Sequence, residues 1–217
     1  MSKLLDHFLV RATVAAVDHV TPRMRRIRLT GPTNLSWTPG QHVRVHVGDL
    51  RLRSYSIWAH RAGALDLCVL DHPGDGPGAR WARDVRPGQP VSFTRPQGRL
   101  VPREAPYHLL VGDETAGVAF GAILRALPPA VPTFTLIEVD DPSDRLDLPG
   151  EVHWVPRPGL LAGLSTLDLP AEPGVAYVAG EARACQAVRR HLVTDRGWPR
   201  TAVVVKPFWT PGRRGLD

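Results

Sequence analysis

The chain has 217 residues, of which 43% are hydrophobic and 22% charged, so it can bury one large core or two smaller ones. No stretch approaches the roughly 20 apolar residues of a membrane span. The first residues also lack a signal-peptide pattern, so we expect a cytoplasmic protein without membrane contact. The net charge is +6, but arginines and acidic residues are interleaved, which argues against nucleic-acid binding.

The first part of the chain contains short strand patterns separated by turn residues. Six segments have this pattern, at residues 8–17, 24–29, 42–47, 53–59, 65–70 and 90–94. In the third segment Val43, Val45 and Val47 alternate with other residues and therefore share one face. Strands with this spacing predict a six-stranded antiparallel barrel, interrupted by one short helix at residues 79–84.

The second part of the chain alternates strands with helices. Apolar strand patterns occupy residues 108–111, 134–139, 152–155, 175–180 and 203–205, and helical patterns occupy residues 116–127 and 182–195. This alternation predicts a Rossmann-like parallel sheet covered on both faces. A proline-rich segment at residues 100–106 separates the two parts. We therefore expect a barrel domain over residues 1–103 and an α/β domain over residues 104–217.

The cysteines indicate a reducing compartment. Cys68 lies in a strand pattern and Cys185 in a helical pattern, far apart in the sequence. Isolated cysteines of this kind are typical of buried thiols. No cluster of Cys and His has the spacing of metal ligands, so we expect no metal bound by the protein itself.

The first candidate site is Arg53-Ser54-Tyr55-Ser56. On a strand, Arg53 and Tyr55 point to one side and the two serines to the other. An arginine can pair with a flavin pyrophosphate as a planar fork, a tyrosine offers a ring to stack on, and a serine can bond the polar edge of the flavin. The alternative is an ordinary half-buried strand with a surface arginine.

A second candidate site is a glycine-rich turn that leads into the short helix. Glycines let backbone N–H groups approach a phosphate, and helix N-termini attract anions. The alternative is a plain turn between barrel strands. The candidate residues are His72, Gly76, Gly78, Ala79, Arg80 and Trp81.

Further candidates follow the strands of the second part, where ligands of parallel sheets bind. Asp113, Thr115 and Ala116 follow the first strand, although they also suit a helix cap and do not form a G-x-G-x-x-G fingerprint. Glu181 follows a later strand, and Arg183 begins the next helix, where it suits a phosphate or lies in solvent. Near the C-terminus Trp209 suits either a flavin ring or the core.

Taken together, these segments resemble the siderophore-interacting protein family, which comprises FAD-binding ferric-siderophore reductases with a ferredoxin-reductase-like fold. Six fragments match the family in order along the chain. They are Val20-Thr21-Pro22-Arg23-Met24, Arg53-Ser54-Tyr55-Ser56, His72 with Gly76-Pro77 and Arg80-Trp81-Ala82, Gly112-Asp113-Glu114-Thr115-Ala116, Ala179-Gly180-Glu181-Ala182, and Phe208-Trp209 with Gly212. The chain departs from the family pattern at Trp58, at Gly117-Val118 and in the short turn Gly48-Asp49-Leu50.

The resemblance implies an FAD-binding barrel followed by an NAD(P)-binding α/β domain. It also implies an enzyme without a catalytic acid–base residue of its own, which passes electrons from NADH or NADPH through FAD to Fe(III) in a siderophore. Basic residues near the flavin would attract an anionic ferric complex, and we expect Lys206, Arg44 and His46 in this role. We expect a monomer or a weak dimer.

Several alternatives stay open at this point. The chain suits a non-catalytic module that binds flavin or siderophore, or an enzyme of the same fold that reduces a quinone, free flavin or a partner redox protein. Glu138, Asp140 and Asp141 favour NADH, since an acid after the second strand can bond a free ribose hydroxyl. Arg145 and Arg183 favour NADPH.

Overall fold

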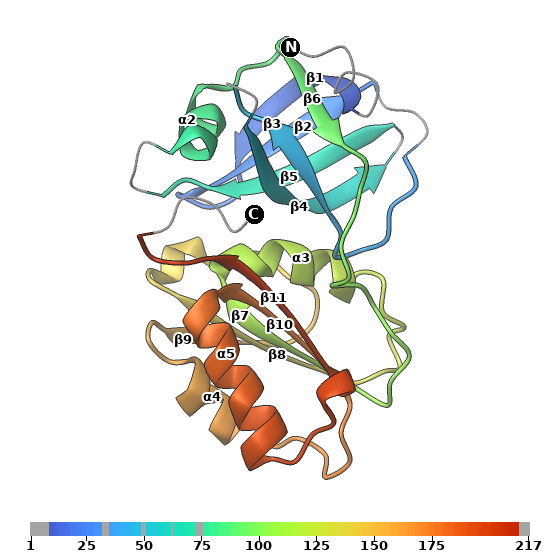
Figure 1. Ribbon diagram of the computed structural model, residues 1–217, viewed down its shortest axis with the longest axis vertical. Helices are drawn as coiled ribbons and strands as arrows, with labels where there is room; N and C mark the ends of the chain where they lie inside the picture. The colour runs from blue at the N-terminus through green and yellow to red at the C-terminus, as the bar shows by residue number, and fades with distance from the viewer. Residues whose placement is uncertain (1–8, 32–34, 49–50, 62, 73–75, 213–217) are drawn as a thin grey trace. The chain divides into compact units, whose positions relative to one another are not determined.

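The computed structural model describes residues 9–31, 35–48, 51–61, 63–72 and 76–212, and it divides into two compact units between Arg99 and Leu100 (Figure 1). The sequence placed this boundary slightly later, between residues 103 and 104. Arg103 ties the proline-rich segment to the rest of the second unit. Its backbone N–H donates to the Tyr177 hydroxyl at 2.9 Å, and its Nη1 atom donates to the Thr201 carbonyl at 3.0 Å.

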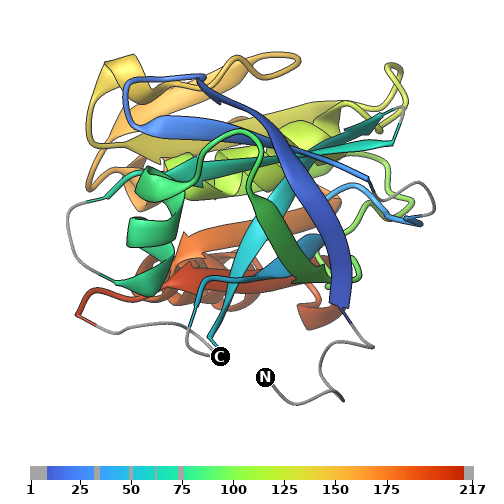
Figure 2. The same cartoon turned by 90° about the horizontal axis from the view of Figure 1, so that it is seen from above.

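The first unit is a closed antiparallel barrel, as predicted. Its strands follow the order β1-β2-β5-β4-β3-β6, and they curve around a common interior in Figure 2. Val43 and Val45 are fully buried in that interior, which confirms the alternation seen in the sequence. Helix α2 packs on the same core through Ala82, and Val85, its C-cap residue, joins the core as well. The elements are β1 (Leu9–His19), β2 (Met24–Thr30), β3 (His42–His46), β4 (Leu52–Arg61), β5 (Ala64–Leu70), α2 (Pro77–Asp84) and β6 (Pro90–Thr94).

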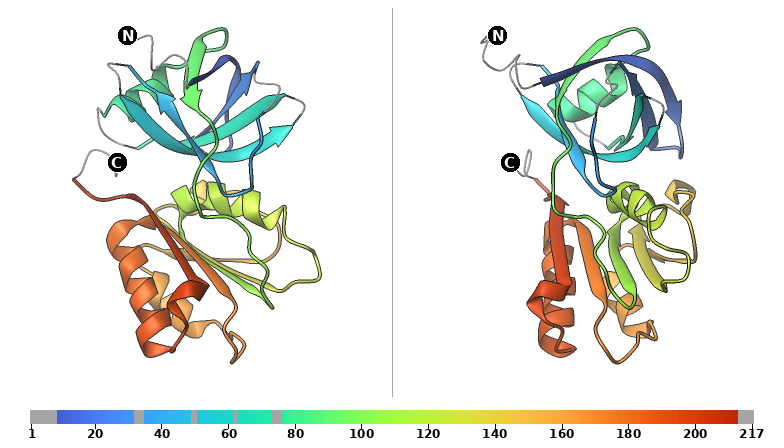
Figure 3. Two further views of the ribbon diagram at one scale, coloured as in Figure 1. Left: turned by 45° about the vertical axis from the view of Figure 1, so that its right-hand side comes forward. Right: turned by 90° about the vertical axis from the view of Figure 1, so that its right-hand side faces the viewer.

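The second unit is a parallel five-stranded sheet of order β11-β10-β7-β8-β9. Helix α3 covers one face, and helices α4 and α5 cover the other, as the right panel of Figure 3 shows. This architecture confirms the predicted Rossmann-like arrangement. The elements are β7 (His108–Asp113), α3 (Glu114–Leu124), β8 (Thr133–Val139), β9 (Val152–Pro156), α4 (Leu160–Thr166), β10 (Val175–Glu181), α5 (Ala182–Arg190) and β11 (Val203–Trp209).

Three helices differ from the expected boundaries. Helix α2 begins at Pro77, two residues earlier than predicted, and ends at Asp84 as predicted. Helix α3 begins earlier and ends earlier than predicted, at Glu114 and Leu124. The predicted helix at residues 182–195 consists of α5 followed by a π-helical segment, His191–Asp195.

Helix α4 has no counterpart in the prediction, because its own residues give weak start signals. It is short, and its N-cap, Gly159, offers no side-chain acceptor. The missing acceptor comes from a different strand, since the Glu138 carboxylate accepts from the backbone N–H groups of Gly159 and Leu160 at 2.8 and 3.4 Å. A tertiary contact of this kind leaves no local trace in the sequence.

The two cysteines match their expected environment. Cys68 and Cys185 are both free thiols and both buried. Burial, together with the nearby Asp113 and Glu181 carboxylates, raises the pKa of Cys185 to about 12, so this thiol stays protonated. None of the helices in the described ranges is long and apolar enough to cross a membrane.

Candidate functional site

In the barrel unit, Arg53 and Tyr55 face helix α2. Both lie opposite core residues of β3 in the strand register, where Val45 pairs with Arg53 and Val43 with Tyr55. The Tyr55 hydroxyl donates to the Gly78 carbonyl at 3.2 Å. Because burial raises the pKa of Tyr55, its phenol remains a proton donor.

The aromatic ring of Tyr55 is shared with helix α2. It stacks on Trp81 with ring centroids 5.3 Å apart and planes 27° apart. A flavin that stacks on Tyr55 must therefore use the ring face that Trp81 leaves open. The sequence assigned Tyr55 and Trp81 to two separate candidate sites, and the structure brings the two rings into contact.

Gly78 lets helix α2 approach these two side chains closely. A Cβ atom at this position would lie 2.9 Å from the Tyr55 hydroxyl and 3.1 Å from Arg53 Cγ. The absence of a side chain therefore keeps the start of the helix within reach of the arginine stem.

The N-terminus of α2 has the features of an anion site. Its N-cap is Gly76, no side chain of the described residues caps it, and Pro77 has no backbone N–H to offer. The N–H groups of Gly78 and Ala79 are therefore the donors at this end, next to the stem of Arg53. These groups fit the pyrophosphate of FAD, because helix N-termini and guanidinium forks are both preferred partners of phosphate.

Other predicted residues of this turn contribute less in the structure. His72 and Arg80 are exposed, and the His72 carbonyl accepts from Arg83 Nη1 at 3.4 Å. The Pro73-Gly74-Asp75 part of the predicted phosphate segment lies outside the described residues.

The opposite face of β3 and β4 carries the serines and the expected substrate residues. Arg44 pairs with Ser54 in the register, and His42 pairs with Ser56. His46 lies on the same face of β3 as Arg44, two residues further on. Its Nε2 atom is buried and makes no hydrogen bond to the described part of the chain. A hydrogen-bond partner for this nitrogen would have to come from outside the described residues.

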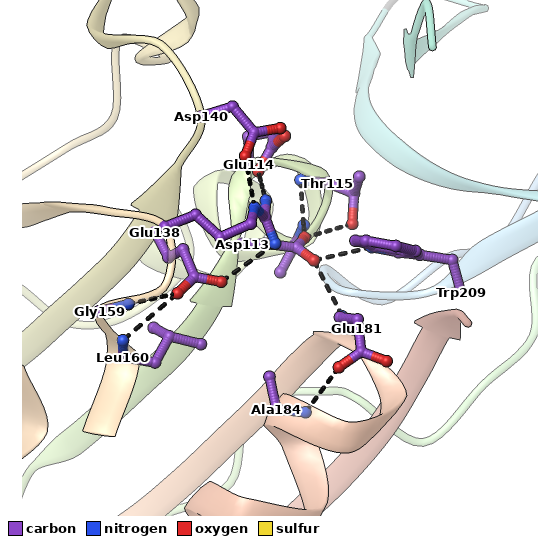
Figure 4. Close-up of polar contacts among 12 residues, drawn as sticks. Asp113, Glu114, Thr115, Glu138, Asp140, Gly159, Leu160, Glu181, Ala184 and Trp209 are labelled. Carbon is purple, nitrogen blue, oxygen red and sulfur yellow. Dashed lines mark hydrogen bonds and ion pairs between the residues drawn. The ribbon is translucent and has the colours of Figure 1, made fainter. Parts of the chain in front are cut away.

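In the α/β unit, the Asp113 carboxylate joins the carboxyl ends of three strands (Figure 4). Its Oδ1 atom accepts from the Thr115 N–H at 3.0 Å, the Thr115 hydroxyl at 2.5 Å and the Ala116 N–H at 3.3 Å. Its Oδ2 atom accepts from the Glu181 N–H at 2.8 Å and from Trp209 Nε1 at 2.7 Å. The structure thus brings together all five residues that the sequence singled out in this unit as cofactor ligands.

These bonds favour the cap interpretation of Asp113 and Thr115. Asp113 is the N-cap of α3 and is buried. A carboxylate has about four lone-pair sites, and five donors already approach it. Asp113 therefore organises its neighbours and has no acceptor left for a cofactor.

Gly180 makes this arrangement possible. Its φ angle is +116°, and a Cβ atom there would lie 2.5 Å from the Asp113 carboxylate. Both the backbone conformation and the space require glycine. The next residue, Glu181, caps α5 by accepting from the Ala184 N–H at 2.7 Å, while its Oε1 atom is buried without a partner among the described residues.

Arg157 is the main residue of this edge that the sequence analysis missed. Its guanidinium bonds Glu114 at 2.5 Å, Glu138 at 3.0 Å and Asp140 at 2.7 Å. Its Cζ atom also lies 5.6 Å from the centroid of the Trp209 ring, within cation–π range. The only sequence signal was its place directly after a strand pattern, among the acids that end the neighbouring strands.

Among the three carboxylates bonded to Arg157, Glu114 has a raised pKa. Burial and the neighbouring Asp113 carboxylate raise the pKa of Glu114 to about 7, although Arg157 acts in the opposite direction. A carboxyl group with this pKa exchanges its proton near neutral pH.

Lys206 lies on β11, opposite Ala179 of β10 in the register, and its side chain is exposed. In the same strand pair, Trp209 lies opposite Glu181, at the edge organised by Asp113. The expected substrate residue Lys206 and the expected flavin contact Trp209 thus lie on one strand, three residues apart.

Comparisons with known sequences and structures agree with this geometry. The sequence profile "Siderophore-interacting FAD-binding domain" matches residues 48–100, and the profile "Siderophore-interacting protein" matches residues 105–212. A crystal structure of a siderophore utilization protein from T. fusca is 27% identical, with a TM-score of 0.81 over 96% of this chain and 95% of that one.

Two curated relatives match nearly the whole chain but differ in how much of their own length is covered. The ferric vibriobactin reductase ViuB of Vibrio cholerae is 29% identical over 236 residues, covering 90% of this chain and 87% of that protein. The mycobactin import ATP-binding/permease protein IrtA of Mycolicibacterium smegmatis is 27% identical over 96% of this chain. The match covers only 26% of IrtA, so the chain spans about a quarter of that relative.

Proposed function

Because the chain belongs to the siderophore-interacting protein family, we propose that it is an FAD-dependent oxidoreductase that passes electrons from NADH or NADPH to Fe(III) in a siderophore. Its likeness to ferric vibriobactin reductase over most of both chains supports this reaction. Release of iron follows, because Fe(II) binds hard oxygen chelators less well than Fe(III).

The observation that carries the proposal is the α2 N-terminus beside Arg53. Gly76 has no side chain with which to cap this helix, and Gly78 allows close contact with Arg53 and Tyr55. In the proposed complex, the N–H groups of Gly78 and Ala79 and the Arg53 guanidinium hold the pyrophosphate. Tyr55, backed by Trp81, supplies an aromatic face.

Bound FAD supplies the conversion of a two-electron hydride donor into single electrons, so the chain needs no acid–base pair of its own. The residues of the chain then have binding and orienting roles. Ser54 and Ser56 offer hydroxyls to the polar rim of the flavin. Arg44 and His46 in the barrel unit would supply positive charge and hydrogen-bond donors that attract an anionic ferric complex, and Lys206 of the α/β unit has a separate candidate role of the same kind.

At the α/β edge, we assign Asp113 the task of fixing Trp209. The edge of the indole donates from Nε1 to Asp113, and one face of the ring contacts the Arg157 guanidinium. These two contacts fix the orientation of the indole ring. Thr115, Ala116 and Glu181 shape the same edge through their bonds to Asp113.

The acidic residues at the end of β8 and just after it, Glu138, Asp140 and Asp141, give no preference between NADH and NADPH. Glu138 is bonded to Arg157 and to the N-terminus of α4, Asp140 is bonded to Arg157, and Asp141 caps the turn at Ser143. The sequence argument for NADH relied on these three carboxylates reaching a ribose hydroxyl, and each of them is engaged within the protein.

The experiment uses the purified protein under anaerobic conditions. We expect a flavin absorption spectrum that bleaches on addition of NADH or NADPH. Addition of an Fe(III) tris-catecholate should restore the oxidised spectrum and produce Fe(II), detected with a chromophoric Fe(II) chelator. A yellow protein that neither nucleotide bleaches would instead be a binding module. Bleaching without reoxidation by ferric complexes, but with reoxidation by a quinone or free flavin, would identify an enzyme with another acceptor.

A further inference from the structure

Arg157 and Trp209 reach toward each other from opposite edges of the five-stranded sheet. Arg157 directly follows β9, which is one edge strand, and Trp209 is the last residue of β11, which is the other. The Arg157 Cζ atom lies 5.6 Å from the centroid of the indole ring. Figure 4 shows the indole of Trp209 pointing toward Asp113, which ends the central strand β7. The two edge strands are therefore linked through side chains above the carboxyl end of the sheet.

The end of β11 relies on these side-chain contacts, because its pairing with β10 is irregular there. Pro207 lies opposite Gly180, but Trp209 lies opposite Glu181, so Phe208 is an additional residue on β11. An additional residue of this kind interrupts the backbone ladder between the two strands. The position of the last residue of β11 therefore depends on how firmly Asp113 and Arg157 hold the indole ring.

The carboxylates around Arg157 carry more negative charge than its guanidinium can balance. The side chains of Glu114 and Glu138 are 3% and 5% exposed, whereas that of Asp140 is 51% exposed. Asp113 is also buried, and its charge acts on both Glu114 and Arg157. Arg157 can balance one of these four charges. Because removing a carboxylate from water is costly, the excess charge favours the neutral form of a buried member of the group.

Glu114 is the member of this group that takes up the proton. Its burial raises its pKa most, and the charges of Asp113 and Asp140 raise it further. The Arg157 guanidinium and the backbone N–H of Glu114 itself act in the opposite direction, and the resulting pKa is about 7. Glu114 is also the residue that follows Asp113 directly, so its charge state is felt by the carboxylate that accepts from the Trp209 indole.

We propose that Glu114 and Arg157 are positioning residues that form a proton-dependent switch, which holds Trp209 and the end of β11 firmly when Glu114 is neutral and loosely when Glu114 is ionised. A neutral Glu114 leaves two carboxylates to compete with the indole face for the charge of Arg157. Ionisation adds a third competitor and places a second buried negative charge beside Asp113. Both changes weaken the hold on the indole, since the cation–π contact depends on the net positive charge that faces the ring.

The indole N–H of Trp209 reports on this switch in the full chain as purified. The chain has six tryptophans, and comparison with Trp209→Phe identifies the Trp209 signal in the NMR spectrum of protein labelled with nitrogen-15. In the wild type this signal should shift with a midpoint near pH 7. Its protection from hydrogen exchange should fall about tenfold between about pH 6 and about pH 8.5, the factor given by one pKa unit of coupling. In Glu114→Gln, which has no proton to release, both the shift and the protection should stay constant over this range.

Asp140→Asn is the matched control, because it removes an exposed carboxylate from the same arginine and should keep the pH-dependent shift of Trp209. The carboxyl carbon signal of Glu114 in the wild type gives a second measurement that needs no variant, and it should titrate with the same midpoint as the indole. Equal pH profiles in the wild type and Glu114→Gln, or loss of the shift in Asp140→Asn as well, would overturn the proposal. A Glu114 carboxyl that titrates near its ordinary pKa of 4.5 would also overturn it. None of these measurements depends on electron transfer, so they leave the proposed function untouched.

Discussion

Replacing Glu114 with glutamine should change how the stability of the protein depends on pH. The pKa of Glu114 is about 7 in the fold, against an ordinary value of 4.5. Between these two values the folded chain holds a proton that the unfolded chain has already released. The free energy of unfolding therefore falls as pH rises through this window, which is the reverse of the usual behaviour of a salt-bridged carboxylate.

The size of the effect follows from the same two values. A difference between 4.5 and about 7, at about 1.4 kcal/mol for each pKa unit, amounts to about 3 kcal/mol. The glutamine variant has no proton to lose, so it lacks this dependence. The stability of the wild type relative to Glu114→Gln should therefore fall by about 3 kcal/mol between pH 4.5 and pH 8.

Urea unfolding followed by circular dichroism at a series of pH values measures this difference. Asp140→Asn is the matched control, since it removes another carboxylate bonded to Arg157, but one whose side chain is 51% exposed and keeps much of its hydration. The difference in free energy of unfolding between Asp140→Asn and the wild type should vary little with pH. A wild-type advantage over Glu114→Gln that grows with pH would refute the reasoning, because it would mean that the bond to Arg157 outweighs burial.

Four further variants test other parts of the structure. Arg53→Ala should weaken FAD binding about ten- to hundredfold through loss of a charge-assisted contact, which titration of the apoprotein with FAD measures; full FAD retention would contradict it. Tyr55→Ala should shift the flavin absorption band and loosen FAD, and an identical spectrum would argue against stacking. Gly180→Ala should lower the free energy of unfolding by about 1–3 kcal/mol, because its φ of +116° is unfavourable for alanine and the added methyl group meets Asp113. Lys206→Ala should raise KM for an anionic ferric siderophore, more at low salt than at physiological salt, and leave flavin reduction by NAD(P)H nearly unchanged; equal slowing of both half-reactions would refute this role.

The barrel and the parallel sheet could both be predicted because their strands carry strong periodic signals. The alternation of Val43 and Val45 identifies a buried face, and both side chains are fully buried in the fold. Helix α4 escaped prediction because its first turn is capped by Glu138 from a neighbouring strand. A cap supplied by a distant residue cannot be recognised from the local sequence.

In the candidate site, too, residues with a local sequence signal were predicted and a residue held by distant partners was missed. Asp113 and Thr115 were identified from a strand-to-helix motif, and the structure places them together with Glu181 and Trp209. Arg157 was missed because its importance comes from three carboxylates that different segments supply. Cap residues can be predicted from a local motif. The role of an arginine held by distant partners can be identified only from the folded structure.

The five donors around Asp113 restrict position 113 to aspartate. The carboxylate faces five donors and offers no hydrogen of its own. An asparagine of the same shape would turn an N–H₂ group toward either the Trp209 indole or the Thr115 hydroxyl. A glutamate is one methylene longer, and the space beside Gly180 fits only the shorter aspartate side chain. A library that samples all amino acids at this position and selects for a folded α/β unit should therefore return aspartate almost alone.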